Sequence, residues 1–117
     1  MRQESSLTTE QRTTLNVLGY LFLRMGQFER AKRVFSALAA LEPDDKWARR
    51  NLAAICVQEG DGASALRHLH AAQEGEPLSS RDAALHLLRA KALWLEERTD
   101  EARRAIDEFM HMAGGAE

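Results

Sequence analysis

A short motif recurs along this chain at a spacing of 34 residues. Gly26-Gln27-Phe28-Glu29-Arg30-Ala31 returns as Gly60-Asp61-Gly62-Ala63-Ser64-Ala65, and Glu42-Pro43 returns as Glu76-Pro77. This period is typical of helix–turn–helix units, which bury their apolar faces by stacking on one another. The repeat therefore predicts an all-α fold built from tandem helical hairpins.

Apolar residues at three- and four-residue steps predict the individual helices. We expect six helices in three hairpins, at roughly 9–25, 28–41, 45–59, 62–74, 80–97 and 100–112. The buried sides are expected to include Leu15, Leu18, Phe22 and Met25 in the first helix, Leu41 in the second, and Ala102, Ile106 and Phe109 in the last. These helices form a single domain at 8–113, with flexible ends at 1–7 and 114–117.

Polar residues mark several of the expected helix starts. Thr8 and Gln11 have the spacing of a capping box, in which each side chain accepts a hydrogen bond from the other's backbone N–H. Asp44 or a neighbour, the Ser79/Ser80 pair and Thr99 are expected to cap three later helices.

The third hairpin follows the second at a longer spacing. If Ala102 is equivalent to Ala65, the spacing is 37 residues, and about three additional residues are expected within Pro77–Asp82. A short stack of hairpins also leaves apolar surface at its ends, which a partner or self-association could cover.

Composition narrows the classes of function. The net charge is −2 and no basic stripe is visible, so nucleic acid is not an expected partner. The single cysteine, Cys56, favours a reducing compartment. No apolar run is long enough for a membrane span and none resembles a signal peptide, so we expect a cytoplasmic protein without membrane insertion.

Residues that could carry catalysis or bind a metal do not form a recognisable site. His68 and His70 are two positions apart on a helix and point away from each other, which is poor geometry for a metal. Ser79 and Ser80 are better explained as a helix cap than as catalytic nucleophiles near His86. We expect no enzyme activity, no cofactor and no metal.

The repeats resemble those of tetratricopeptide-repeat proteins. The matching consensus positions are Leu15, Leu18, Gly19, Phe22, Gly26, Phe28, Ala31, Phe35 and Pro43 in the first repeat and Leu52, Ala53, Gly60, Ala65, Leu69, Ala72 and Pro77 in the second. The resemblance implies three hairpins in a short right-handed solenoid, which binds partners through the inner face of the first helix of each pair.

The resemblance also implies which residues line that inner face. From the first helix they include Asn16, Tyr20, Leu23 and Arg24; from the third, Trp47, Arg50, Ala54 and Val57; from the fifth, Leu87, Lys91, Trp94 and Leu95. This apolar and aromatic set with interspersed basic residues suits an apolar peptide segment. Trp47 and Trp94 could instead pack between helices, and Arg50 could form only exposed helix pairs.

Asn16 and Tyr20 also bear on one alternative ligand. Repeat domains that hold acidic C-terminal tails of heat-shock chaperones use a clamp with Lys and Asn at these two places. The chain therefore does not fit that clamp.

A narrower resemblance is to the small chaperones of bacterial type III secretion, most closely the YscY type. It rests on Leu7-Thr8 with Gln11, Gly19-Tyr20-Leu21, Gly26-x-x-Glu29-Arg30-Ala31, Leu38-x-x-Leu41-x-Pro43 and Arg49-Arg50. It implies a cytoplasmic bacterial protein that binds a small export-apparatus protein of the YscX type as a heterodimer and engages the export gate with it.

Other interpretations stay open on the sequence. The chain could be a chaperone of translocator subunits, although such relatives usually carry an additional N-terminal helix, for which the residues before Thr8 leave no room. A general tetratricopeptide adaptor and a structural protein that self-associates through its solenoid ends are further possibilities.

Overall fold

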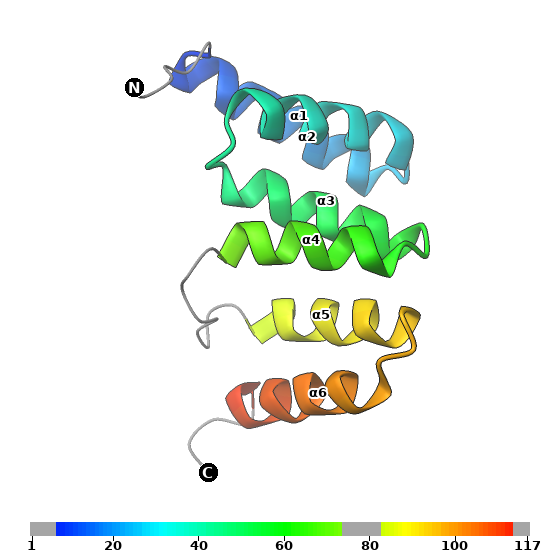
Figure 1. The fold of residues 1–117 in the computed structure, drawn as a ribbon. Helices are drawn as coiled ribbons and strands as arrows, with labels where there is room; N and C mark the ends of the chain where they lie inside the picture. Colours follow the sequence, from blue (N-terminus) through cyan, green and yellow to red (C-terminus); the bar gives the residue numbers. More distant parts are fainter. Residues whose placement is uncertain (1–6, 74–82, 114–117) are drawn as a thin grey trace.

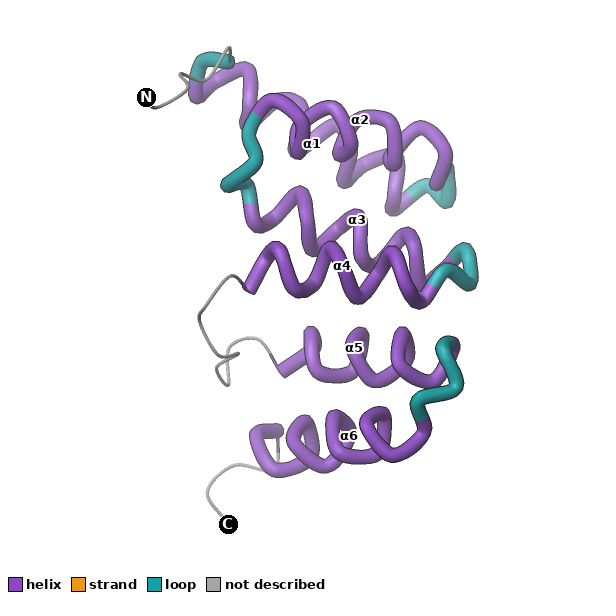
Figure 2. Tube along the Cα trace, in the orientation of Figure 1, coloured by secondary structure: helices purple, strands orange, loops and turns teal. Residues whose placement is uncertain are grey.

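Three helical hairpins stack one below the other in chain order (Figure 1). The computed structural model describes residues 7–73 and 83–113. Within these ranges the chain is helix joined by turns, with no strand (Figure 2). The helices are α1 (Thr9–Arg24), α2 (Phe28–Leu41), α3 (Lys46–Gln58), α4 (Gly62–Gln73), α5 (Ala83–Leu95) and α6 (Thr99–Ala113). The all-α repeat architecture is as predicted.

The tight turn inside each hairpin has the same geometry in all three repeats. Gly26, Gly60 and Glu97 have φ angles of 76°, 81° and 60°, a left-handed conformation that glycine adopts at little cost. In each turn the next backbone N–H donates to a carbonyl five residues earlier, as Asp61 N does to Cys56 O at 2.8 Å. The turns are 34 and 37 residues apart, which confirms the predicted register of the third repeat. The predicted insertion within Pro77–Asp82 lies outside the described residues.

Two of the predicted caps are present. Gln11 N donates to Thr8 Oγ1 and Thr8 N donates to Gln11 Oε1, both at 3.0 Å, so the capping box is complete. Asp45 caps α3, where its Oδ1 accepts from Ala48 N at 3.0 Å. Thr99 is already the first residue of α6, one position earlier than predicted, so its role as the N-cap is not confirmed. The predicted cap at Ser79/Ser80 lies outside the described residues.

Small residues allow the helices within and between hairpins to approach closely. Gly19 of α1 lies against the ring of Phe35, and a Cβ atom there would be only 2.7 Å from Phe35 Cζ. Gly62 lies equally close to α5, because its Cβ would be 2.5 Å from Ala92 O. Side chains larger than hydrogen at these two positions would force the helices apart.

The core is a series of clusters along the stack. One joins the first hairpin to α3, a second joins α3 and α4 to α5, and a third lies in the last hairpin, where Leu66 of α4 packs against it. Leu7, which was expected in a flexible segment, packs against the first cluster.

Several residues that were expected on buried sides are exposed. Leu18 of α1, Met25 just after α1, Leu41 at the end of α2 and Ile106 of α6 are all exposed to solvent. The prediction was wrong at Leu18 and Ile106 for the same reason. Helices at the two ends of a stack have a neighbouring repeat on only one side.

Candidate protein-binding face

The predicted inner-face residues occupy equivalent places on α1, α3 and α5. We call the exposed part of this surface the odd-helix face. It consists of Tyr20 and Arg24 from α1, Trp47 from α3, and Leu87, Lys91, Trp94 and Leu95 from α5. Whether a partner contacts these residues stays a prediction at this stage.

An aromatic contact joins α1 to α3 on this face. The rings of Tyr20 and Trp47 have centroids 6.0 Å apart, and the Trp47 ring meets buried Phe35 edge-on at 5.9 Å. Arg24 Nη1 donates to Tyr20 Oη at 3.2 Å, and its guanidinium lies 5.9 Å from the Tyr20 ring centre. Trp47 therefore packs in part between helices, as one of its two expected roles requires, while the rest of its ring stays exposed.

Asn16 has a structural role that the sequence did not reveal. Its Nδ2 donates to Oδ2 of Asp45 at 3.1 Å, while the other carboxylate oxygen of Asp45 caps α3. This bond holds α1 against the start of α3 and so fixes the spacing of the two helices. Leu23, another predicted contact, is partly buried against the first core cluster.

Val57 does not belong to the exposed face. It is only 5 % exposed and is a member of the second core cluster, which also contains Ala92 of α5. The helix of the following repeat covers this position, so a partner could reach almost none of it. Its assignment as a binding residue is therefore corrected.

The remaining α3 positions are also less exposed than the odd-helix face. Ala54 is partly buried, and so is Arg50. Arg50 lines a small cavity between α3, α4 and α5 together with Leu69, Leu85 and Arg89. Among the predicted binding residues of α3, Trp47 is thus the exposed one.

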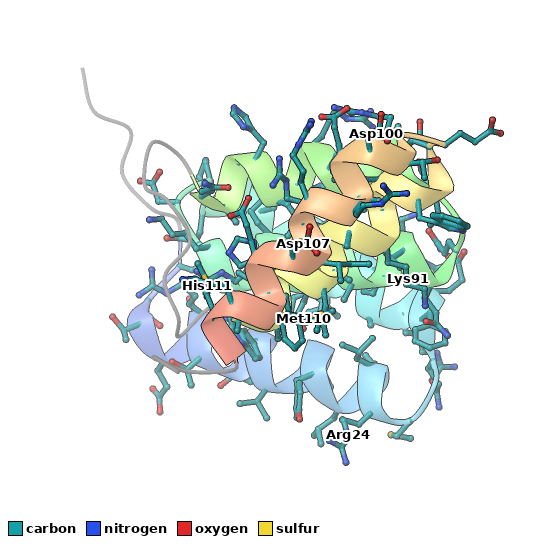
Figure 3. The ribbon with its side chains drawn as sticks, turned by 90° about the horizontal axis from the view of Figure 1, so that it is seen from below. Arg24, Lys91, Asp100, Asp107, Met110 and His111 are labelled. Carbon is teal, nitrogen blue, oxygen red and sulfur yellow. The ribbon has the colours of Figure 1, made fainter. Side chains whose placement is uncertain are left out.

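The fifth helix contributes the largest exposed apolar surface of the predicted set. Leu87, Trp94 and Leu95 are all exposed, with Lys91 between them. Trp94 lies three residues before the left-handed Glu97, just as Val57 lies three residues before the left-handed Gly60. Trp94 is nevertheless exposed, because no further helix of the described chain covers it. Lys91 lies between Leu87 and Leu95 along α5, and Figure 3 shows Lys91 and Arg24 below and to the right of α6.

Histidines elsewhere in the chain do not assemble into a site. His68 Nδ1 lies 3.4 Å from Arg49 Nη1, and burial and this guanidinium lower the pKa of His68. His86 is buried in α5, with Nδ1 4.0 Å from a carboxylate oxygen of Glu108 on α6. No group of three or more His, Cys, Asp or Glu residues in the described part of the chain could hold a metal.

Helical hairpins that repeat with one register and leave apolar side chains on one set of helices define a helical-repeat scaffold for binding other proteins. A model of the tetratricopeptide repeat matches residues 22–81, just over half of the chain. The chain belongs to the tetratricopeptide repeat family, whose domains typically bind protein partners and are not catalytic. No curated protein matches it.

The helices of residues 7–73 and 83–113 include none with the length and hydrophobicity of a membrane span.

Proposed function

We propose that this protein is a secretion chaperone that binds an apolar segment of a small export-apparatus protein through the odd-helix face. The client is of the YscX type of bacterial type III secretion. Binding takes place in the cytoplasm before export, keeps the client soluble and presents it to the export gate. The YscY-type resemblance of the first half of the sequence supports the choice of client.

The exposure of apolar side chains on the odd helices is the observation that carries this proposal. Tyr20, Trp47, Leu87 and Leu95 each keep more than a third of their surface accessible, although helical proteins usually bury such residues. Aromatic residues on a rigid helix are efficient anchors, because few torsions must be ordered when a partner covers them. The face is therefore ready to bind without a large rearrangement.

Basic residues beside these anchors indicate what the client segment should contain. Arg24 is already oriented by its hydrogen bond to Tyr20, and Lys91 is exposed on α5. A segment with apolar residues at helical or alternating spacing and with acidic flanks fits this surface. Acidic flanks would speed association and fix the orientation of the segment more than they would raise its affinity.

Co-expression with a small secretion protein of the YscX type tests the proposal. The expected product is a stable complex of equal stoichiometry. Leu87→Glu places a charge on the odd-helix face and should reduce affinity at least tenfold. Leu41→Glu is a matched control, since Leu41 is 43 % exposed at the end of α2 and Leu87 is 44 % exposed.

Circular dichroism should show the same helical content in both variants. Equal client affinity of Leu87→Glu and wild type would contradict the role of the odd-helix face. Binding of a translocator subunit, or of a partner outside any secretion system, by the same face would instead favour one of the two alternative functions.

A further inference from the structure

The last helix exposes apolar residues at positions that are buried in the earlier repeats. Residues in different repeats are equivalent when they lie at the same distance along the chain from the left-handed turn residue, which is Gly26, Gly60 or Glu97. Ile106 is equivalent in this sense to Phe35 and Leu69. Those two residues are 0 % and 6 % exposed, yet Ile106 is 42 % exposed. Met110 is equivalent to Ala39 and is 63 % exposed, whereas Ala39 is 7 % exposed. In the first repeat α3 covers these positions. Beyond α6 the described chain has no such helix, and Figure 3 shows Met110 on this end of the molecule.

The first helix shows the complementary pattern at the opposite end. Leu18 and Leu21 are equivalent to Leu52 and Ile55 of α3, which are 2 % and 0 % exposed. In α1 the same positions are 39 % and 50 % exposed. On α3 these residues pack against the preceding repeat, and the described chain has no repeat before α1.

The exposed residues of α6 and α1 are equivalent to the two sides of the contact between neighbouring repeats. At the junction between the first and second repeats, Phe35, Leu38 and Ala39 of α2 share a core cluster with Ala48, Leu52 and Ile55 of α3. Their equivalents at the ends of the stack are Ile106, Phe109 and Met110 on α6 and Thr14, Leu18 and Leu21 on α1. None of these six carries a charge, and Leu18 and Leu21 match the size of the side chains that they replace.

The direction of the helices also suits a continued stack. At each repeat junction a helix that runs toward the left of Figure 1 is followed by one that runs back to the right. Helix α6 runs leftward and α1 runs rightward in the same view. A second copy placed below α6 would therefore present its α1 in the orientation that α3 has relative to α2.

We propose that copies of this chain associate head to tail, with α6 of one copy packed on α1 of the next in the arrangement of α2 on α3. The contact is heterologous, because it joins two different surfaces and leaves one of each free at the ends of every assembly. Association therefore continues beyond the dimer as concentration rises. The proposal does not depend on the odd-helix face or on the client.

Sedimentation equilibrium of the full chain tests this arrangement. The average mass of wild type should rise steadily with concentration. Ile106→Glu and Leu18→Glu each add a charge to one half of the contact, so each variant alone should remain monomeric. A mixture of the two should form a dimer, because intact α6 of the Leu18→Glu chain can still pack on intact α1 of the Ile106→Glu chain. This dimer should not grow further.

Both substituted side chains are exposed, so the variants should keep wild-type helicity. Met110→Glu and Leu21→Glu provide a second pair at more exposed positions, and Leu41→Glu should assemble as wild type does. A wild-type monomer at every concentration would overturn the proposal, and so would two single variants that each dimerise alone. Leu87→Glu should leave assembly unchanged, which separates this result from the test of client binding.

Discussion

The left-handed residue that closes the third hairpin makes a quantitative prediction about stability. Glu97 occupies the place of Gly26 and Gly60 and has a φ of 60°, the only positive φ at a non-glycine residue among those described. A side chain in this conformation places Cβ too close to the carbonyl oxygen that follows it, which costs roughly 1–2 kcal/mol. We therefore expect Glu97→Gly to stabilise the protein.

The size of the gain follows from two opposing terms. Glycine removes the cost of the left-handed conformation, but its unfolded state has more freedom and offsets roughly 0.5–1 kcal/mol of the gain. The net increase in the free energy of unfolding is about 0.5–1 kcal/mol, or a rise in Tm of about 2–6 °C. The exposed Glu97 side chain lies on the surface, so little packing should be lost.

Urea unfolding followed by circular dichroism measures this difference. Glu97→Ala keeps Cβ and removes the carboxylate, so it should change stability much less than Glu97→Gly. The reverse change, Gly60→Ala, should cost about 1 kcal/mol through the backbone alone, because no atom lies within 4 Å of the added Cβ. Equal stability of Glu97→Gly and Glu97→Ala would show that the left-handed conformation of residue 97 carries no such cost.

Three further predictions concern the interior. Gly19→Ala should destabilise the protein by about 1–3 kcal/mol and alter its near-ultraviolet circular dichroism, since the new methyl group would displace the buried Phe35 ring. Burial and Arg49 lower the pKa of His68 in the folded protein, so stability should fall as the pH drops below about 6.5, the ordinary pKa of histidine. In a plot of the urea midpoint against pH, His68→Gln should show a smaller fall in this range. Burial also raises the pKa of the Cys56 thiol, so a thiol reagent should label it only after denaturant unfolds the chain.

The regular repeats could be predicted well from the sequence. The spacing of glycines and alanines predicted where the hairpins lie, including the longer spacing of the third repeat. It could do so because the helices of each hairpin approach closely at the same position and require a small side chain there. Gly19 illustrates the rule, since any larger residue would meet the Phe35 ring. The capping box at Thr8 could be predicted equally well, because it depends only on local backbone geometry.

The exposure of individual apolar residues could not be predicted in the same way. Val57, Leu18 and Ile106 all lie at positions that recur in the repeats, yet whether each is buried depends on the presence of a neighbouring repeat. Helical periodicity describes one helix at a time and does not count the neighbours that cover it. The role of Asn16 in holding Asp45 was missed for a similar reason, because the two residues are far apart in the sequence.

The proposal that a client binds the odd-helix face can be tested by NMR titration of the labelled chain with that client. The indole N–H signal of Trp47 and the side-chain signals of Tyr20 and Leu87 should shift and saturate together. Saturable binding that leaves these three signals unchanged while the surfaces of α2, α4 and α6 respond would rule out this face as the binding site.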